Sequence, residues 1–437
     1  MVERATVNQV TQIGVEATPG TAVAALKKLQ ALSIEPGIKA NINSYRPMGA
    51  KYQTIAALGK EWTEASIEGP LAYNDLTYLL ASVLSYAAPV QQGGTAAYLW
   101  TFTPAQSAED TVKTFTVESG SPVRAGRFTY GLVNELGITI TRDEATVSGS
   151  MFGRRYEDDV HLSTNATYTL TAAATPPSSG NFTLTFGAQT TANIAHNATP
   201  AAVETALEAL STIGTGNVEV VATVATGAGN LSVAANVYTV EFVNALAQAP
   251  RTLTGTFTSL DPSGSIALAA GTVGVVPTAI ALMPVLPTQV DVYCDTTGAG
   301  LGGTQLLRAL RTELSIGGRF GQVWPLNSSL SGFDTHVELA PGATLKLLVA
   351  ADSAGMGLLT PMRSGDKRFI RTKAVGPLAD TGHYYTLQMD VCGQVAEVGE
   401  FSDEDGIYAL EYTFNVAYDA TWTKAIEVQL KNLVSAL

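Results

Sequence analysis

A glycine signature in the second half of the chain has the residue types of a nucleotide-binding loop. The apolar run VDVYC leads into GAGLGG, so that Gly298, Gly300 and Gly303 satisfy the G-x-G-x-x-G spacing. In dinucleotide-binding folds such glycines let the backbone approach a pyrophosphate, and an acid about 20 residues further on holds the ribose. That position falls in GRFGQVWP, which contains no acid. Because Leu306 to Ile316 fits a strand as well as a helix, we interpret GAGLGG as a flexible loop.

The other side chains able to do chemistry do not form a catalytic or metal-binding set. No pair of histidines has metal-ligand spacing, and the four are far apart in the chain: His161, His196, His336 and His383. The acidic run DEDG begins at Asp403, but Phe414 stands where a calcium loop needs a glutamate, so we interpret the run as a solvated turn. We predict no enzyme activity, no cofactor and no metal.

Composition and charge narrow the possible classes of protein. The chain has 437 residues, enough for two or three domains, and 46% of them are hydrophobic while 14% are charged. Abundant Thr, Val and Gly favours a fold rich in strands and turns. The formal net charge of -13 argues against a nucleic-acid-binding protein, because affinity for DNA comes mainly from Lys and Arg.

Neither an oxidising compartment nor a membrane is indicated. Cys294 and Cys392 lie in apolar alternating runs and are predicted to be buried free thiols. The first residues lack the basic and apolar regions of a signal peptide. The uncharged stretch Gly264 to Leu286 is long enough to span a bilayer, but Pro277 and Pro284 interrupt it and it has no basic anchors. We interpret it as strand and linker.

The first part of the chain, residues 1–163, reads as strands around a single helix. The helix is predicted from an apolar stripe at helical spacing, with Asn74 or Asp75 as its cap: Leu76, Leu79, Leu80, Val83 and Leu84. GITITRDEATVSGS reads as a hairpin. The segment Ile42 to Trp62 has no clear period and is predicted to be a long loop, which in a compact domain is usually functional or mobile.

The composition changes in the middle of the chain, where we place an inserted α+β domain at residues 164–282. Only six charged residues occur between Asn165 and Ala281. ATPAAVETALEAL predicts a helix with Thr199 as its N-cap and Pro200 at its first position. NFTLTF, VEVV and VYTVEF predict strands, and TPPSSG reads as a joint.

Strand patterns resume in the last part, residues 283–437. Here Ile426, Val428 and Leu430 alternate with polar residues, which predicts a C-terminal strand in a hairpin around DATW.

Several segments in the right order resemble the major tail tube proteins of long flexible-tailed, siphovirus-type bacteriophages. IGVEATPGTAVAALKKL resembles their opening, IEGPLAYNDLTYLLASVLS the strand leading into their helix, and VNELGITITRDEATVSGSMFGRRYE their central hairpin. PVLPTQVDVYCDTTGAGLGGTQLLRALRTELSIGGRFGQVWPLNSS and HVELAPGATLKL resemble their second half, so the match covers about Gln12 to Leu162 and Met283 to Leu433. The block between is similar to a small module of phage and bacterial surface proteins.

The resemblance implies a mainly β protomer, a tail-tube-type sandwich or barrel with one flanking α-helix. Such a protein is a structural virion component: six copies form a ring, stacked rings form a hollow tube, and phage DNA passes through it into the host without specific binding. The implied partners are the chain itself, the tape measure protein and the tail terminator and tip proteins. The implied location is the phage tail, assembled in the host cytoplasm, with no insertion into a membrane.

An acidic tube wall would repel phosphates and let DNA slide. Candidate wall residues are the polar positions alternating along GITITRDEATVSGS and YALEYTFNVAY. Ring-to-ring contacts are predicted for the loop Asn43 to Lys60, where Arg46, Lys51 and Lys60 can meet acids of the next ring, and for the C-terminal tail from Lys431. The arm Val2 to Lys28 is either such a contact or an edge strand of its own domain.

Three other readings stay open at this stage. Another phage virion structural or decoration protein has the same composition. A secreted β-sandwich adhesin or carbohydrate-binding module predicts exposed aromatic platforms, whereas the four tryptophans are scattered along the sequence. An enzyme that uses the glycine loop is the third.

Overall fold

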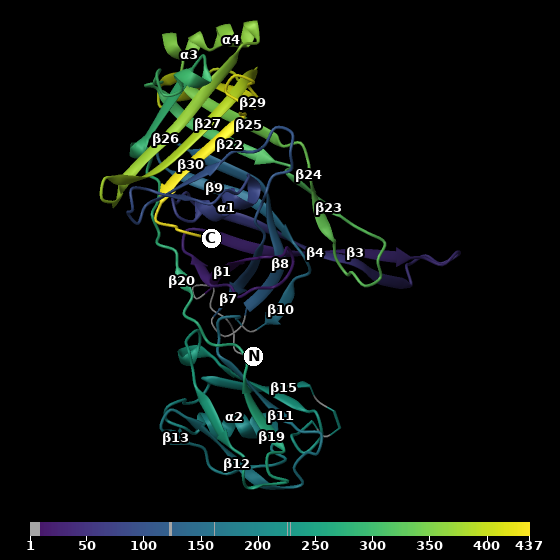
Figure 1. The fold of residues 1–437 in the computed structure, drawn as a ribbon. Helices are drawn as coiled ribbons and strands as arrows, with labels where there is room; N and C mark the ends of the chain where they lie inside the picture. Colours follow the sequence, from purple (N-terminus) through teal and green to yellow (C-terminus); the bar gives the residue numbers. More distant parts are fainter. Residues whose placement is uncertain (1–8, 122–124, 161, 225, 228) are drawn as a thin grey trace.

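The computed structural model describes residues 9–121, 125–160, 162–224, 226–227 and 229–437. His161 and the first seven residues of the predicted arm, from Val2, lie outside this range. Strands form most of the regular structure, so the predicted mainly β class is confirmed (Figure 1).

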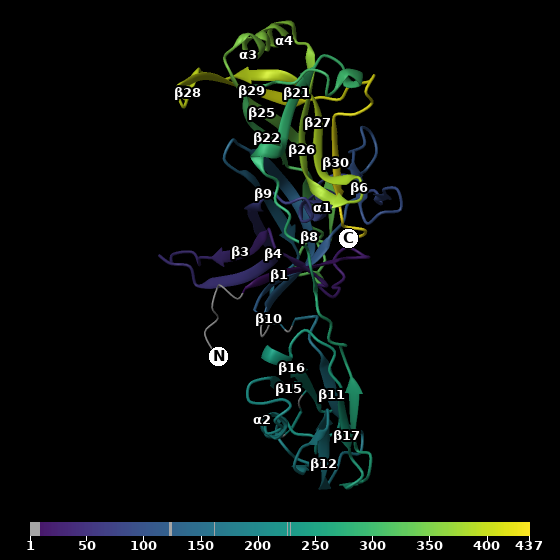
Figure 2. The same ribbon diagram turned by 90° about the vertical axis from the view of Figure 1, so that its left-hand side faces the viewer.

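Two large hydrophobic cores divide the described part of the molecule. The larger core draws its residues from both ends of the chain, from Ile13 to Met151 and from Ile280 to Leu430. The smaller core runs from Ala166 to Ile266 and lies within the segment 164–282 set apart by its composition. The smaller body, which we call the α2 lobe, sits at one end of the molecule (Figures 1 and 2).

The α2 lobe contains a four-stranded sheet and one helix. The sheet has the order β15-β16-β11-β19, with these bounds: β11 Thr167–Ala172, β15 Val218–Val224, β16 Val237–Phe242 and β19 Ile266–Ala270. Helix α2 spans Pro200–Glu208, and its predicted cap is confirmed because the Thr199 side chain accepts a hydrogen bond from the Ala202 amide at 3.3 Å. Around strand β12 lie further short strands: β12 Ser179–Phe186, β13 Gln189–Thr190, β14 Ile194–Ala195, β17 Leu253–Thr256 and β18 Leu260–Asp261.

The first part of the larger body consists of two sheets that share one long strand, β8. Its strands are β1 Val10–Val15, β3 Ser33–Tyr45, β4 Ile55–Pro70, β7 Phe115–Gly120, β8 Ala125–Ile140, β9 Ala145–Gly153 and β10 Glu157–Val160. The beginning of β8 lies between β7 and β10, which gives the order β1-β7-β8-β10. The end of β8 pairs with β9, which gives the order β3-β4-β9-β8. The predicted β8–β9 hairpin is confirmed.

The last part of the chain repeats this arrangement around β27. Its strands are β21 Val290–Asp295, β22 Ala309–Gly317, β25 Gly342–Ala350, β26 Lys367–Asp380, β27 His383–Val398, β29 Ile407–Val416 and β30 Ile426–Asn432. Their orders are β21-β26-β27-β30 and β22-β25-β29-β27, and every pair is antiparallel as in the first part. Helices lie at matching places: α1 (Leu76–Val83) follows β4, and α3 (Ser353–Gly357) with α4 (Leu359–Ser364) follows β25. We call the two parts the first and second repeat.

The sequence carries a trace of this duplication at the centre of each repeat. GLVNELG (residues 131–137) in β8 and GQVAEVG (residues 393–399) along β27 share the pattern G-x-V-x-E-x-G. Both strands have a register shift at the same place in the pattern, between Val133 and Glu135 and between Val395 and Glu397. LSIEPGI (32–38) and LRTELSI (310–316) also correspond, with Leu, Glu and Ile in the same places.

One further pairing joins the two repeats into a single eight-stranded ribbon. The end of β8 pairs with β22, from Leu136 opposite Ile316 to Ile140 opposite Thr312. The ribbon therefore runs β3-β4-β9-β8-β22-β25-β29-β27. The α2 lobe leaves the larger body after β10, and the chain returns through β20 (Thr278–Ala279), which pairs with β2 (Lys27–Leu29).

The predicted helix is present, but it is buried on all sides instead of along one stripe. Every residue of α1 from Leu76 to Val83 is buried between the sheets. The predicted side-chain cap is wrong, because the Asp75 carboxylate accepts hydrogen bonds from the Gln30 and Ala31 amides instead, at 3.2 and 3.3 Å. Backbone amides from a distant part of the chain bind this carboxylate in place of the amides of the helix, and burial raises its pKa.

The C-terminal segment and the uncharged stretch before residue 287 both contain strands. The C-terminal strand is confirmed as β30, whose Ile426, Val428 and Leu430 are buried. The stretch Gly264 to Leu286 contains β19 and β20, and no helix in the described residues is long and apolar enough to cross a membrane. Short elements complete the larger body: β5 Val90–Gln91, β6 Tyr98–Phe102, β23 Phe320–Val323, β24 Thr335–Glu338 and β28 Ser402–Glu404.

Candidate assembly interface

The glycine signature forms a closed loop between β21 and β22. The Asp295 carboxylate accepts hydrogen bonds from the amides of Gly302, Gly303 and Thr304 at 2.9, 3.2 and 2.9 Å. These are the backbone groups with which a phosphate-binding loop holds its anion, and here a carboxylate already occupies them. Leu306 to Ile316 is strand from Ala309 onward, so the parallel βαβ unit of a dinucleotide fold is absent at this point.

The two cysteines and the acidic run DEDG lie at defined places in the fold. Cys294 and Cys392 are buried free thiols as predicted, and burial raises the pKa of each to about 11. DEDG is the turn between β28 and β29, where the Gly406 amide donates to the Asp403 carboxylate at 2.6 Å. Among the described residues, no group of three or more His, Cys, Asp and Glu side chains is placed to hold a metal.

The eight-stranded ribbon has one buried face and one polar face. Alternation along β4 shows the pattern: Thr63, Ala65 and Ile67 are buried, whereas Glu64 and Glu68 point away from the core and are exposed. Register carries the same alternation across all eight strands, because paired residues in a sheet project to the same side. We call the outward side of the ribbon the polar face.

Glutamates dominate the charge of the polar face. It carries seven of them and three basic residues: Glu35, Glu64, Glu68, Glu135, Glu313, Glu397, Glu411, Lys39, Arg311 and Lys346. Each base has a carboxylate partner on the same face: Lys39 with Glu64 at 3.6 Å, Lys346 with Glu313 at 3.9 Å, and Arg311 with Glu411. Four glutamates remain beyond these three pairs, so the face is net negative.

Small residues, namely Ser, Thr, Asn, Gly and Ala, fill most of the other positions on this face. From the two segments singled out in the sequence, Thr139 and Ser148 lie on β8 and β9, and Thr413 and Asn415 lie on β29. Register places Thr139 opposite Glu313 and Thr413 opposite Glu397, which puts all four on the same side of the ribbon. The polar face is therefore lined by short side chains and carboxylates.

A long hairpin, β3–β4, projects from the body at the edge of the ribbon (Figures 1 and 2). The prediction of an irregular loop over Ile42 to Trp62 is wrong, since β3 runs to Tyr45 and β4 starts at Ile55. The sequence shows no strand period here because both faces of the hairpin are exposed, so apolar and polar residues do not have to alternate. Its exposed apolar side chains are Ile38, Ile42, Tyr45, Met48, Tyr52, Ile55 and Leu58.

The three basic residues predicted to make inter-ring contacts lie in two different settings. Arg46 and Lys51 are exposed in the turn of the projecting hairpin. Lys60 lies further back on β4, where its ammonium group donates to the Pro325 carbonyl at 2.8 Å and lies 5.9 Å from the centre of the Trp324 ring. The structure thus separates two exposed cations at the tip from one that is held within the chain.

The corresponding connection in the second repeat, residues 318–341 between β22 and β25, is folded against the first repeat. Its Trp324 packs edge-to-face on Trp62 of β4 with ring centres 5.2 Å apart, and Phe333 packs on Phe152 of β9 at 5.5 Å. Tyr130 of β8 joins this cluster, 5.0 Å from Phe333. The first repeat therefore forms a docking surface for the hairpin region of the second.

A buried arginine fastens the same connection. Arg319 is 2% exposed and forms ion pairs with Asp110 and, at 2.5 Å, with Glu338, and its Nε donates to the Val83 carbonyl at 3.1 Å. His336 contacts the Tyr130 hydroxyl at 2.8 Å, and burial lowers the pKa of this histidine. The charges are paired and hydrogen-bonded, as a buried ion needs to be.

Both ends of the ribbon have an open edge. In the described residues no strand pairs with the side of β3 that faces away from β4. At the other end, β26 pairs with β27 only as far as Gln394, so the last residues of β27 have no strand on that side. A long open edge invites pairing with another chain.

The two chain ends are attached to their own subunit. Strand β1 pairs with β2 and β7, so for the described part of the arm the alternative of an own-domain strand is the one observed. At the other end, the Asn432 side chain donates to the Tyr73 carbonyl and the Thr77 hydroxyl at 2.8 and 2.7 Å. The Val434 carbonyl accepts from the Trp100 indole at 2.9 Å.

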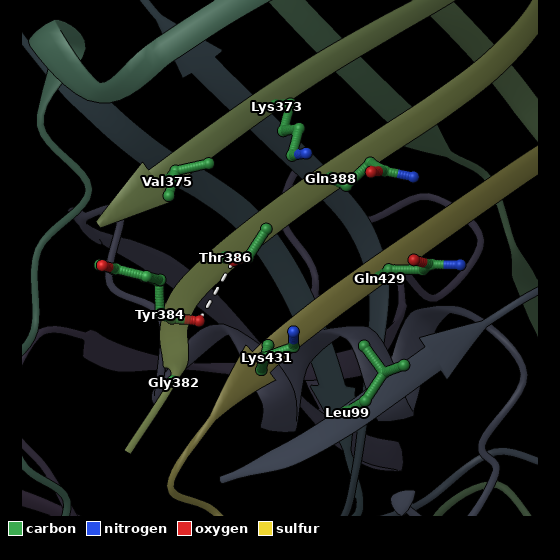
Figure 3. Close-up of a pocket in the computed structure, with 9 residues that line it drawn as sticks. All are labelled: Leu99, Lys373, Val375, Gly382, Tyr384, Thr386, Gln388, Gln429 and Lys431. Atoms are coloured by element: carbon green, nitrogen blue, oxygen red, sulfur yellow. Dashed lines mark hydrogen bonds between the residues drawn. The ribbon is translucent and has the colours of Figure 1, made fainter. Parts of the chain in front are cut away.

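A shallow depression of about 290 Å³ lies on the second repeat, over β26, β27, β30 and β6 (Figure 3). Lys373, Gln388 and Gln429 form a row across its floor, with Lys431 beside them. Among the described residues, its lining contains no carboxylate, imidazole or thiol.

Comparison with known proteins gives matches among solved structures. No family model and no curated protein matches the chain. Among solved structures it is similar to the SPP1 tail tube, with 13% identity over 34% of this chain and 79% of that one and a TM-score of 0.23. It is also similar to a structure from Mycobacterium phage Patience, with 13% identity over 55% and 79% of the two chains and a TM-score of 0.19. Both overlaps are partial, so the function has to be inferred from the geometry of the chain itself.

Proposed function

We propose that this protein is a structural subunit of a phage tail tube and has no enzymatic role. The observation that carries the proposal is the eight-stranded ribbon, which buries one face, presents a polar and negative face on the other, and ends in two open edges. Joining such ribbons edge to edge produces a closed barrel, and closure leaves no open edge. The resemblance of the sequence to tail tube proteins agrees with this geometry.

Size supports the proposal. A barrel of about 24 strands, spaced ~4.8 Å apart and tilted ~40°, has a backbone diameter of about 48 Å. Side chains on the inner wall occupy about 10 Å of that width, which leaves a bore wide enough for double-stranded DNA. Short side chains on the polar face keep the bore open.

Charge supports the passage of DNA without binding. The polar face has four glutamates in excess over its ion pairs, and each further copy adds to this charge. A negative wall repels phosphates, whereas a basic wall would hold them by releasing counterions. In this proposal the chain assembles with itself in the host cytoplasm, meets tape measure and tail terminator or tip proteins, and remains in the virion.

Negative-stain electron microscopy of the purified full-length protein tests the proposal. We expect hollow cylinders with a uniform diameter, formed spontaneously at high protein concentration. A protein that stays monomeric at all concentrations and salt conditions would overturn it.

The negative wall has its own test. Replacing Glu35, Glu68 and Glu135 by Lys should give tubes that retain DNA and release it as salt is raised, because counterion release makes such binding salt-dependent. The matched control has the same charge change on exposed acids outside the ribbon, Glu109, Asp261 and Asp366. If both triple variants retain DNA equally, the polar face does not line the bore.

A further inference from the structure

We propose that the open edge of β3 pairs with the open edge of β27 in a second copy of this chain, and that three copies close a ring. The pairing would repeat, between chains, the β8–β22 junction that already joins the two repeats within one chain. This inference rests on the proposed function and names its partner and stoichiometry.

The internal junction supplies the template. It is antiparallel and places Ile316 opposite Leu136, Ser315 opposite Gly137 and Leu314 opposite Ile138. The strand β22 reaches β8 on the side that β7 leaves free after Gly131. In the second repeat, β26 leaves the same side of β27 free after Gln394, and no described strand fills it.

Superposing the repeats by their register gives the expected pairs. Ile38 on β3 corresponds to Ile316 on β22. Their cross-strand partners, on β4 and β25, occupy the same place in the two hairpins. Val398 corresponds to Leu136 through the shared pattern of GQVAEVG and GLVNELG. We therefore expect Ile38 of one chain opposite Val398 of the next, and Gly37 opposite Gly399.

Burial at equivalent positions marks the missing neighbour. Ile316, whose strand has a partner on both sides, is 2% exposed, while Ile38 at the same place in the first repeat is 58% exposed. Leu136 is 1% exposed, and Val398 at its equivalent place is only half-buried. The same two positions are closed inside the chain and open at its two ends, and a second copy closes both at once.

The contact is head-to-tail, so it must close into a ring or continue as a filament. Each chain contributes eight strands to the ribbon, or about 50 Å of circumference at ~4.8 Å spacing and ~40° tilt. Three copies give about 24 strands and a backbone diameter of about 48 Å. Two copies would give a backbone diameter of about 32 Å, and side chains would narrow the bore almost to the width of a duplex. Six copies would give a backbone diameter of about 96 Å.

The resemblance to tail tube proteins implies six copies in a ring, and three chains with two repeats each would supply the same number of repeats. The ring would have six similar repeats but only three α2 lobes, since one lobe follows each first repeat.

A paired-cysteine variant tests the contact. In assembled protein, Ile38→Cys with Val398→Cys should form an interchain disulfide on mild oxidation, because directly opposite residues of an antiparallel pair are within disulfide reach. The non-reducing gel should lose most of its monomer band, and the ladder should end at three times 45.6 kDa. The matched control pairs Ile38→Cys with Val90→Cys, an exposed position on strand β5 of the other sheet, and should stay monomeric on the gel.

The outcomes separate this inference from the proposed function. Tubes without the disulfide, or with the control pair linked equally well, overturn the β3–β27 contact while the tube role stands. A ladder that ends at six chains overturns the ring of three. Absence of any tube in the unsubstituted protein overturns the proposed function itself. Averaged end-on images give an independent reading, because three projecting α2 lobes per ring are expected and six would contradict the inference.

Discussion

The two repeats share a fold but differ in what their hairpin regions touch. In the second repeat, the connection between β22 and β25 lies on the first repeat and is fastened there by Arg319 and Trp324. In the first repeat, the β3–β4 hairpin projects with its apolar side chains exposed (Figure 1). The same position in the fold is therefore covered by the chain itself in the second repeat and left exposed in the first. We propose a neighbouring copy as the partner that covers it.

Removal of the projecting hairpin should have the largest effect. Deleting Asn43 to Gly59 is expected to leave a folded protein that forms no tubes, because the exposed apolar side chains of the hairpin lie outside the larger core. Near-ultraviolet circular dichroism would check the fold and electron microscopy the assembly. Normal tubes from this deletion would contradict an assembly role for the hairpin.

Loss of the Arg319 ion pairs, which hold the β22–β25 connection in place, should destabilise the monomer. Arg319→Met removes the cation from the buried carboxylate of Asp110 and from the partly exposed carboxylate of Glu338, and breaking a buried pair typically costs about 3–5 kcal/mol of unfolding free energy. Urea denaturation would measure this. The control is Lys39→Met, which breaks the exposed pair with Glu64 and should cost about 0–1 kcal/mol. Equal losses in the two variants would mean that the connection is not held by Arg319.

Excision of the α2 lobe should change the outline of the assembly but not its formation. The lobe has its own core and leaves and re-enters the larger body near β2 and β10. Replacing Asn165 to Ala281 by a short Gly/Ser bridge is expected to give smooth tubes of the same bore. If only monomers remain after the excision, the lobe takes part in assembly and the two repeats do not suffice.

The smallest effect is expected at a carboxyl group of the first repeat without a counterpart in the second. Burial raises the pKa of Glu118 on β7, so the stability that its protonated form provides is present in acid and lost as pH rises through the raised pKa. Glu118→Gln keeps an acceptor for the Ser163 amide but cannot ionise. The variant should gain stability relative to the parent above neutral pH and match it near pH 4, as followed by thermal unfolding. A difference that does not change with pH would rule out this carboxyl as the cause.

Much of the fold follows from local patterns. The alternation in GITITRDEATVSGS predicts β8 and β9, and Thr199 before Pro200 predicts the start of α2, because each of these signals depends on neighbours a few residues away. The helix α1 is found for the same reason. Its cap is not, because Asp75 is engaged by the distant amides of Gln30 and Ala31.

The candidate interface was only partly visible in the sequence. Arg46 and Lys51 lie at an exposed tip, and their inter-ring contacts stay a prediction. The apolar side chains beside them show no period, so the sequence predicts a loop where the structure has a hairpin. The duplication did leave a signal, since GLVNELG and GQVAEVG are spelled alike, yet seven residues at so great a separation are easily overlooked. Only the matching pairings around β8 and β27 turn that likeness into a repeat.

The sequence by itself determined a mainly β protein with few charges in its central block and an excess of acids. It also predicted no set of reactive residues. Composition and short-range spacing suffice for these statements. Tertiary structure decided that Asp295 closes the glycine loop and that the glutamates gather on one side of a single ribbon. It also decided that one edge of β3 and one edge of the end of β27 pair with no strand in the described residues. The physical reason is that pairing between strands brings together residues hundreds of positions apart, and neither register nor an open edge is encoded in any one segment.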